Sequence, residues 1–403
     1  MTMDEMPKKE LMTLLAIGGA GCRILRRVAE SSAADRLRLL AVDTDASALE
    51  ALALPGENTL LAAARWRAGR GCGGNTIDGQ RAVAHERSRL EKMLSGSEFL
   101  VVVGGLGGGT ASGGAPVVLS VARKLGIATM FLMTLPFSLE GHSKRKIAEE
   151  TVREELLELA DAVLCLPNDL LFSVLAPTTP LAEAFRLADE QVSRALLALT
   201  AVLGYGNLLA PEFGSFAALL RRKKSFCSIG VGVAKREEDG VAWVEKAMER
   251  LLASPLLGGA DKLGAADAVI FSLLGGPELS IGDAKAALEL AGSHMRGETQ
   301  MVVGASTGEE WAGMMQLTAV TVRFDAENEV AQVMQKAAER TPRRSRSGGA
   351  GEDASQLTLP FLETVSKGIM EKTAPVFWEN EDLDIPTFKR RNATVDNGKT
   401  ARE

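Results

Sequence analysis

The chain has 403 residues, of which 46% are hydrophobic and 24% charged, a composition typical of a soluble globular protein with two domains. A formal net charge of −6 argues against nucleic-acid binding through a basic surface. The four cysteines form no CxxC pair, which favours a reducing cytosol over a disulfide framework or a zinc site. Glycines end the first apolar run, Leu11 to Gly19, so we expect a cytoplasmic protein with neither signal peptide nor membrane insertion.

Short apolar runs alternate with helical patterns and glycine-rich turns from Leu11 to about Pro177. Five runs predict buried strands of a parallel sheet: LLAIG, LRLLAVDTD, FLVVVGG, ATMFLMTLP and AVLCLP. Helices are expected between them, including Ala115–Leu125 and Lys144–Leu159. The alternation indicates a doubly wound α/β domain. Ligands of such domains bind at the carboxyl ends of the strands, where these glycine-rich turns fall.

A long helical pattern follows from Pro180 to about Leu203, with apolar residues at three- and four-residue steps. At about 1.5 Å per residue it would span roughly 35 Å, enough to bridge two domains. A second α/β unit comes next, with a helix expected over Val241–Ala253. Its predicted strands are CSIGVGVA, AVIFSLLGG, TQMVVGAS and MQLTAVTVRF.

The pattern of regular elements fades after Phe324. Residues Arg343–Ser355 are polar and rich in glycine and serine, which predicts a flexible linker. Beyond it, the mixed segment Val376–Arg391 has apolar residues with no predicted core to join.

The strongest local signal for binding is GGLGGGTASGGAP, Gly104 to Pro116, between a predicted strand and a predicted helix. Glycines let backbone N–H groups approach an anion closely, and the start of the following helix adds a favourable dipole. A plain strand-to-helix turn needs one or two glycines, whereas this segment has seven. The segment therefore predicts a phosphate-binding turn.

Two further glycine loops have the same character, Gly18–Gly21 after the first strand and Gly69–Asn75. Three such loops in one α/β domain indicate a nucleotide with several phosphates. Because no G-x-x-x-x-G-K-[ST] motif is present, the chain is not expected to be a P-loop NTPase. A Rossmann oxidoreductase is a weaker alternative, since it rests on the first loop alone and lacks candidate hydride-transfer residues.

These loops resemble those of the tubulin/FtsZ family of GTPases. GGLGGGTASGGAP is similar to the family signature GGGTGTG, GGAGCR to GGAGGN, and GRGCGGNTIDG to GLGAGGNPEVG. Further similarities run in order along the chain: Asp43-Thr44-Asp45, Pro136–Gly141, Pro167-Asn168-Asp169, Phe185-x-x-x-Asp189, Ser254–Leu257 and Gly275–Pro277. The resemblance extends in register from about Leu11 to Val322.

The resemblance implies a site for GTP or GDP, with Mg²⁺ carried by the phosphates and no metal site made by the protein alone. Residues implied to cradle the phosphates are Gly19, Ala20, Gly21, Cys22, Arg23, Gly107, Gly108, Gly109, Thr110, Ala111 and Ser112. Residues implied to approach the γ-phosphate are Gly71, Gly73, Gly74 and Asn75.

Four more residues complete the implied nucleotide site. Glu140 would hold the ribose hydroxyls, and Lys144 stands where the family has an arginine that contacts phosphate. Phe185 would stack on guanine, although it fits equally well as a core residue of the long helix. Asp189 would accept from guanine N1 and the exocyclic amine, and a carboxylate there rejects adenine. Arg23 replaces the family's asparagine and keeps positive charge near the phosphates.

Hydrolysis in this family uses two acids from the neighbouring subunit, on a loop of pattern N-x-D-F-x-D. The matching segment is Pro211–Ser215, where Glu212 keeps the first acid and Ser215 replaces the second. A register shifted by three residues would instead place Glu212 at the second acid. Since one carboxylate remains in either register, we expect slow GTP hydrolysis. A non-hydrolysing scaffold filament is the alternative.

The segment Asp382–Arg391 resembles the C-terminal peptide of the FtsZ branch, which docks on membrane-anchoring division proteins. The resemblance thus implies a tubulin-like α/β protein that assembles head to tail and forms the division ring on the inner face of the membrane. Its implied parts are a GTP-binding domain (11–179), a central helix (180–204), a second α/β domain (205–325), a linker (326–375) and a partner-binding tail (376–403).

Overall fold

The structure is a computed structural model. It describes residues 12–31, 34, 37–62, 68–173, 175–176, 178–203, 225–324, 377–378 and 381–382. The chain divides into two compact units, residues 1–343 and residues 344–403. In the second unit a short hairpin is described, in which β11 (Phe377–Trp378) pairs antiparallel with β12 (Glu381–Asp382).

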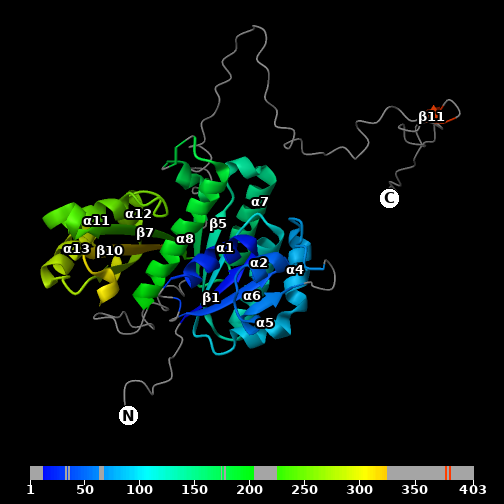
Figure 1. Cartoon of the computed structure of the whole chain (residues 1–403), viewed down its shortest axis with the longest axis horizontal. Coiled ribbons are helices and arrows are strands. Elements are labelled where there is room, and N and C mark those ends of the chain that lie inside the picture. Colours follow the sequence, from blue (N-terminus) through cyan, green and yellow to red (C-terminus); the bar gives the residue numbers. More distant parts are fainter. Residues whose placement is uncertain are drawn as a thin grey trace, which may run out of the picture. The chain divides into compact units, whose positions relative to one another are not determined.

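Ten strands of the first unit form one sheet in the order β3-β2-β1-β4-β5-β6-β7-β10-β8-β9 (Figure 1). Their bounds are β1 Met12–Ile17, β2 Arg38–Asp43, β3 Thr59–Leu61, β4 Phe99–Gly105, β5 Ala128–Leu135, β6 Ala162–Pro167, β7 Phe226–Lys235, β8 Ala268–Gly275, β9 Gln300–Thr307 and β10 Met314–Arg323. The nine strands expected from the sequence are confirmed, each within two residues of its expected bounds. The short strand β3 was not expected.

The α-helices of the first unit connect these strands. Their bounds are α1 Gly18–Ala29, α2 Ala46–Glu50, α4 Thr76–His85, α5 Arg87–Leu94, α6 Gly109–Lys124, α7 His142–Glu150, α8 Leu181–Leu203, α10 Arg236–Asp239, α11 Trp243–Leu252, α12 Asp261–Ala265 and α13 Ile281–Ser293. Short 3-10 turns lie at η3 Gly56–Asn58, η4 Ser138–Glu140, η6 Asn168–Ser173, η7 Gly240–Ala242 and η8 Glu309–Trp311. The helix expected over Lys144–Leu159 is α7 followed by a π-helical turn, η5 Thr151–Leu156.

Strands β1 to β6 are parallel and lie between two layers of helices, as the doubly wound prediction requires. One apolar cluster joins side chains such as Leu15 and Val102 of the sheet to Val118 of α6. The other joins Leu14 and Val101, on the opposite face, to α1, α2 and α8. Because side chains alternate along a strand, successive residues of β1 belong to different clusters.

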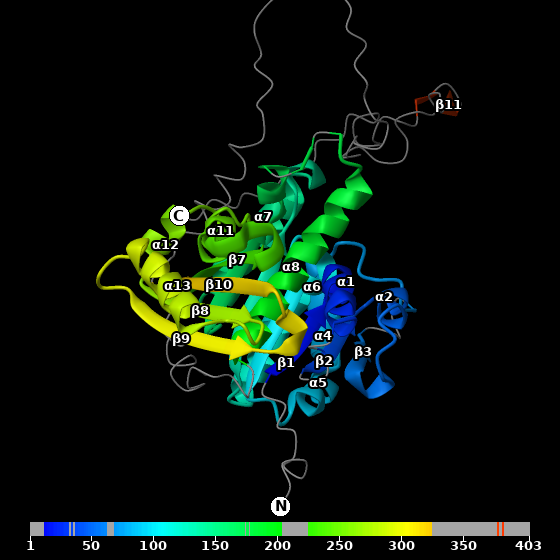
Figure 2. The same ribbon diagram turned by 60° about the vertical axis from the view of Figure 1, so that its left-hand side comes forward.

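Helix α8 packs against strands from both halves of the sheet (Figure 2). Val192 and Leu196 belong to the same apolar cluster as Leu14 of β1 and Ile229 of β7. The long bridging helix predicted from the apolar spacing is therefore confirmed. It is 23 residues long, starting at Leu181.

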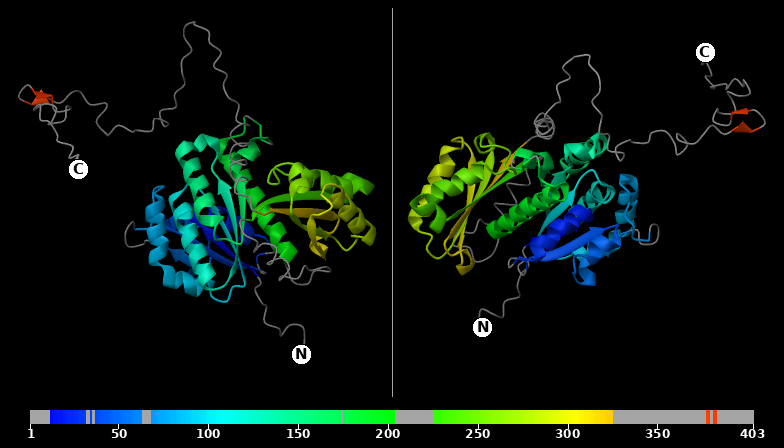
Figure 3. Two further views of the ribbon diagram at one scale, coloured as in Figure 1. Left: turned by 180° about the vertical axis from the view of Figure 1, so that it is seen from behind. Right: turned by 45° about the horizontal axis from the view of Figure 1, so that its top comes forward.

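The second half of the sheet changes strand direction. β10 is antiparallel to both β7 and β8, while β8 and β9 are parallel (Figure 3). On one face α11, α12 and α13 cover these strands, with Trp243 fully buried beside Phe271. β7 joins the first half by pairing with β6, Val163 opposite Phe226, so the sheet is continuous.

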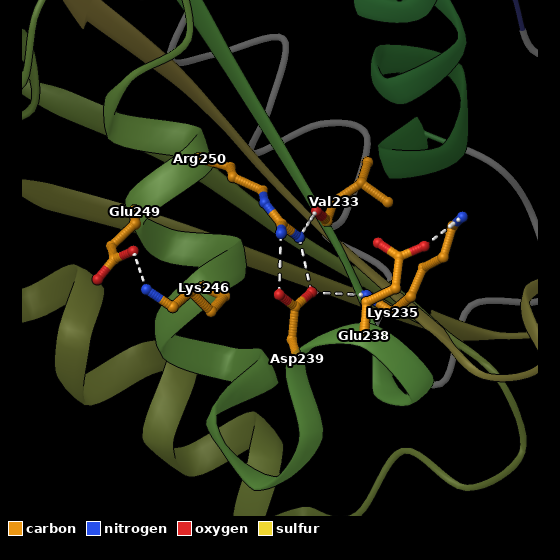
Figure 4. A network of polar contacts seen from close by, with 7 residues as sticks. All are labelled: Val233, Lys235, Glu238, Asp239, Lys246, Glu249 and Arg250. Atoms are coloured by element: carbon orange, nitrogen blue, oxygen red, sulfur yellow. Dashed lines mark hydrogen bonds and ion pairs between the residues drawn. The ribbon is translucent and has the colours of Figure 1, made fainter.

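A polar network fastens the end of β7 to α11 (Figure 4). Asp239 accepts hydrogen bonds from Arg250 Nη1 and Nη2 at 2.7 and 2.8 Å and from the Lys235 backbone N–H at 3.1 Å. Arg250 also donates to the carbonyl of Val233 at 2.8 Å. The hydrogen bonds from Arg250 lower the pKa of Asp239. This fork-to-carboxylate geometry fixes the orientation of α11 over the strand.

Candidate functional site

Two helices begin side by side at the carboxyl ends of neighbouring strands. β1 runs directly into α1 at Gly18, and β4 leads through Gly108, the N-cap, into α6. β1 and β4 are paired, with Ile17 opposite Gly104, so the two helix starts are adjacent. The free N–H groups and positive dipole ends of both helices therefore face one region, which favours a polyanion.

A cavity of about 300 Å³ lies at this edge of the sheet. Its walls include eleven of the residues predicted to bind the nucleotide. These are Gly19, Ala20, Arg23, Gly108, Gly109, Thr110, Ala111, Glu140, Lys144, Phe185 and Asp189. They come from α1, the N-cap and first turn of α6, the η4 turn, α7 and α8, so segments distant in sequence converge here.

Four predicted residues outside the cavity wall support the two phosphate turns. A Cβ on Gly21 would lie 2.4 Å from the Val103 carbonyl, so glycine there lets α1 approach β4. The Gly107 N–H donates to Ser112 Oγ at 2.9 Å, which closes the turn before α6. Cys22 is buried, and its thiol points at Asp43 Oδ2, 3.9 Å away.

The third glycine loop, with Gly71, Gly73, Gly74 and Asn75, leads into α4. The three glycines have positive φ angles of 74°, 59° and 83°, a backbone conformation that side chains with a Cβ rarely adopt. Asn75 is the N-cap of α4, and its Oδ1 accepts from the N–H groups of Ile77 and Asp78. The predicted contact of this loop with a γ-phosphate stays a prediction.

Several glycines of the segment Gly104 to Pro116 allow two helices to pack closely. The expected helix start at Ala115 is too late, because α6 begins at Gly109. A Cβ on Gly109 would lie 2.7 Å from the Asn75 carbonyl, and one on Gly113 would lie 2.1 Å from the Thr76 carbonyl. Some of the glycines that predicted a phosphate-binding turn therefore permit close contact between α4 and α6 instead.

Phe185 and Asp189 lie one turn apart on α8, and both line the cavity. The ring of Phe185 meets Phe137 edge to face, with centroids 5.0 Å apart. The side chain of Asp189 is 10% exposed and accepts a hydrogen bond from Arg23 Nε at 2.8 Å. Arg23 was expected near the phosphates, whereas its described contact is with Asp189.

Glu140 and Lys144 form another part of the wall. Glu140 Oε1 accepts from the Phe137 N–H at 2.9 Å, which fixes the η4 turn. Its Oε2 pairs with Lys144 Nζ at 3.1 Å. The half-exposed ammonium of Lys144 is therefore placed at the cavity, next to a carboxylate that could accept hydroxyl groups.

A buried polar cluster joins Thr110, a predicted phosphate contact, to Asp43, Thr44 and Cys72, which were not predicted to contact the nucleotide. Thr110 and Thr44 hydroxyls are 2.7 Å apart, and the Cys72 thiol lies 3.2 Å from Thr44 Oγ1. Asp43 accepts from the Thr44 N–H at 2.7 Å, and burial raises its pKa. The signal was a run of three polar residues, Asp43 to Asp45, that begins at the last residue of a buried strand.

The predicted hydrolytic residues Glu212 and Ser215 lie outside the described residues, as do the linker and the tail beyond Asp382. Among the residues that are described, no group of three or more His, Cys, Asp or Glu side chains converges as a metal site. No helix in that same part of the chain has the length and apolar character needed to cross a membrane.

This fold and cavity define a tubulin-type GTPase domain joined to a second α/β part. A model of the Tubulin/FtsZ family GTPase domain matches residues 12–176, and a model of the FtsZ family C-terminal domain matches residues 226–325. The chain is 32% identical over 307 residues to cell division protein FtsZ 1 of Archaeoglobus fulgidus, covering 76% of this chain and 80% of the relative. The chain belongs to the tubulin/FtsZ family and is a divergent FtsZ-like member.

Other relatives and solved structures agree. FtsZ 1 of Thermococcus kodakarensis is 30% identical over 336 residues, covering 82% of this chain and 87% of the relative. The empty FtsZ dimer of M. jannaschii superposes with a TM-score of 0.70 at 26% identity, over 78% of this chain and 88% of that one. A GTPγS-bound protofilament of CetZ2 from Haloferax volcanii shares the fold, with a TM-score of 0.64 at 20% identity over 82% and 99% of the two chains.

Proposed function

We propose that this protein is a GTP-dependent cytoskeletal protein that assembles into the filament of the division ring and hydrolyses GTP where subunits meet. The observation that carries the proposal is one cavity with two chemically different kinds of lining. The starts of the adjacent helices α1 and α6 line it, and so do the aromatic ring of Phe185 and the carboxylate of Asp189. A guanosine nucleotide has the complementary groups, anionic phosphates at one end and a flat base with two hydrogen-bond donors at the other.

The residues of the site fit this ligand. Helix N-termini stabilise phosphate oxygens without a lysine-bearing P-loop. Glu140 at the wall would accept from the ribose hydroxyls. Mg²⁺ takes oxygen ligands and keeps several waters, so it would be carried mainly by the phosphates.

Assembly follows from the family relationship. A homologue at 26% identity is an FtsZ dimer, and we propose that this chain likewise associates head to tail with copies of itself. In such an assembly the loop with Glu212 and Ser215 would reach the nucleotide of the next subunit. Because Ser215 cannot supply a negative charge at pH 7, we propose that hydrolysis is slow. The tail from Asp382 to Arg391 would bind a membrane-anchoring division protein and hold the filament at the inner face of the membrane.

Competition binding tests the nucleotide proposal. A labelled GTP analogue bound to the protein should be displaced by GTP at far lower concentration than by ATP. Asp189→Ala should weaken GTP binding by about 1–3 kcal/mol, because guanine donors would lose a charged partner in a buried site. Equal displacement by ATP and GTP in the wild type would rule out a guanine-nucleotide protein.

A further inference from the structure

The cavity wall contains an ion pair that the family pattern does not predict. Arg23, on α1, donates from Nε to Oδ2 of Asp189, on α8, over 2.8 Å. The two residues are 166 positions apart in the sequence. The family pattern has an asparagine where this chain has Arg23, so the cation is a departure from that pattern.

The contact uses one of the two carboxylate oxygens. Among the described residues no side chain or backbone group donates to Asp189 Oδ1, and both Arg23 and Asp189 line the cavity. A carboxylate has about four lone-pair sites on its two oxygens. With Arg23 in place, Oδ1 and the second site on Oδ2 remain for a ligand.

A second contact one turn further along α8 shows that the two helices are held together here. Ser193 Oγ lies 3.3 Å from the carbonyl oxygen of Ile24, the residue after Arg23, and the group is buried. Helix α1 also carries Gly19 and Ala20 of the first phosphate turn. The Arg23–Asp189 pair therefore links the residue expected to select the base to the helix whose start faces the phosphates.

We propose that Arg23 is a specificity-determining positioning residue: it holds the Asp189 carboxylate in the orientation that accepts both guanine donors, so that the 2-amino group is read. This inference rests on the proposed binding of guanine nucleotide. Without the arginine, the Asp189 side chain has no described partner that fixes its torsion angles. The carboxylate then has several orientations, and only some of them satisfy N1–H and the 2-amino group together.

The ligand that isolates this effect is inosine triphosphate, which keeps N1–H and lacks the 2-amino group. Dissociation constants for GTP, GDP and ITP are measured by competition against a fluorescent GTP analogue. The variants are Arg23→Ala and Arg23→Lys, with Arg26→Ala as the matched control. Arg26 is an exposed arginine of the same helix that does not line the cavity.

The wild type should prefer GTP over ITP by about 10- to 100-fold, the effect of one hydrogen bond to a charged group. Arg23→Ala should reduce this preference to about threefold or less and leave the GTP-to-GDP ratio unchanged. Arg23→Lys should recover much of the preference, because the present contact is a single point that an ammonium can replace. Since Arg23 is about half exposed, the pair contributes little to stability and the variants should fold.

Three results would overturn the inference. An unchanged GTP-to-ITP ratio with a changed GTP-to-GDP ratio would place Arg23 at the phosphates. Tighter GTP binding by Arg23→Ala would show that Arg23 competes with the guanine base for the Asp189 carboxylate. An equal loss of the GTP-to-ITP preference in the Arg26→Ala control would show that removing any positive charge from α1 has the same effect. A wild type that binds ATP as well as GTP would instead refute the proposed function and be recognised before any variant is compared.

Discussion

Replacing Gly79 by alanine should disturb both the stability of the protein and its nucleotide site. A Cβ at this position of α4 would lie 2.1 Å from the carbonyl oxygen of Gly109 and 2.7 Å from its carbonyl carbon. Both atoms belong to the backbone at the start of α6, so no side-chain rotation relieves the overlap. The two helices would have to separate by about 1 Å or more to restore ordinary van der Waals contact.

The expected cost follows from two opposing effects. Overpacking of a filled interface costs about 1–3 kcal/mol and sometimes more, whereas alanine is favoured over glycine in a helix by about 1 kcal/mol. Because the new Cβ overlaps backbone atoms, which cannot rotate away, the upper part of the overpacking range applies and Gly79→Ala should destabilise by about 2 kcal/mol. The compact unit of residues 1–343 should then lose roughly 3 °C in its unfolding midpoint, at an unfolding entropy of about 2.1 cal/mol/K per residue. Affinity for GTP should also fall, since Gly109 lines the cavity.

Thermal unfolding with and without GTP measures both effects. The matched control is Gly292→Ala on α13, where a new Cβ would have no neighbour within 4 Å. The same chemical change should there leave the midpoint unchanged or raise it slightly. A Gly79→Ala protein with the wild-type unfolding midpoint and the wild-type affinity for GTP would refute this reasoning. It would show that the close approach of α4 and α6 does not constrain the turn before α6.

Three further predictions follow from other parts of the chain. Ser215→Asp should raise the GTPase rate of assembled protein by about 10²-fold or more with unchanged GTP affinity, and phosphate release that does not change would show that the second acid lies elsewhere. Truncation after Pro375 should leave GTP-dependent light scattering intact and abolish binding to the membrane anchor; loss of assembly would refute a separate tail. Burial raises the pKa of Asp43 above its usual 3.8. The free energy of unfolding of the wild type, relative to that of Asp43→Asn, should therefore be greatest at low pH and decline as the pH rises through that raised pKa. Urea unfolding at several pH values measures this difference, and a difference that does not change with pH would contradict the prediction.

The sequence by itself determined the strands and the class of site. Runs such as Phe99–Gly105 and Ala162–Pro167 are apolar throughout because parallel strands are covered on both faces, and the structure has strands with those same bounds. The apolar spacing of Leu181–Leu203 likewise specified the long helix. These signals are local, since each depends on residues a few positions apart.

Eleven of the residues predicted from the sequence to bind the nucleotide line one cavity. The turn at Gly108–Ala111 and the pair Phe185 and Asp189 line one cavity although they lie far apart in the chain. The resemblance implied this place for Phe185 and Asp189. The turn was expected at the site because it follows the carboxyl end of a parallel strand. The roles of individual residues toward the nucleotide remain predictions.

The tertiary structure alone decided contacts that depend on how helices cross. Arg23 reaches Asp189 because α1 and α8 pack on the same face of the sheet, and no local pattern specifies that distance. The glycines Gly79 and Gly113 look alike in sequence to those of a phosphate turn, yet backbone atoms of the facing helix occupy the space of their missing side chains. Such pairings are set by packing of whole elements, which only the folded chain specifies.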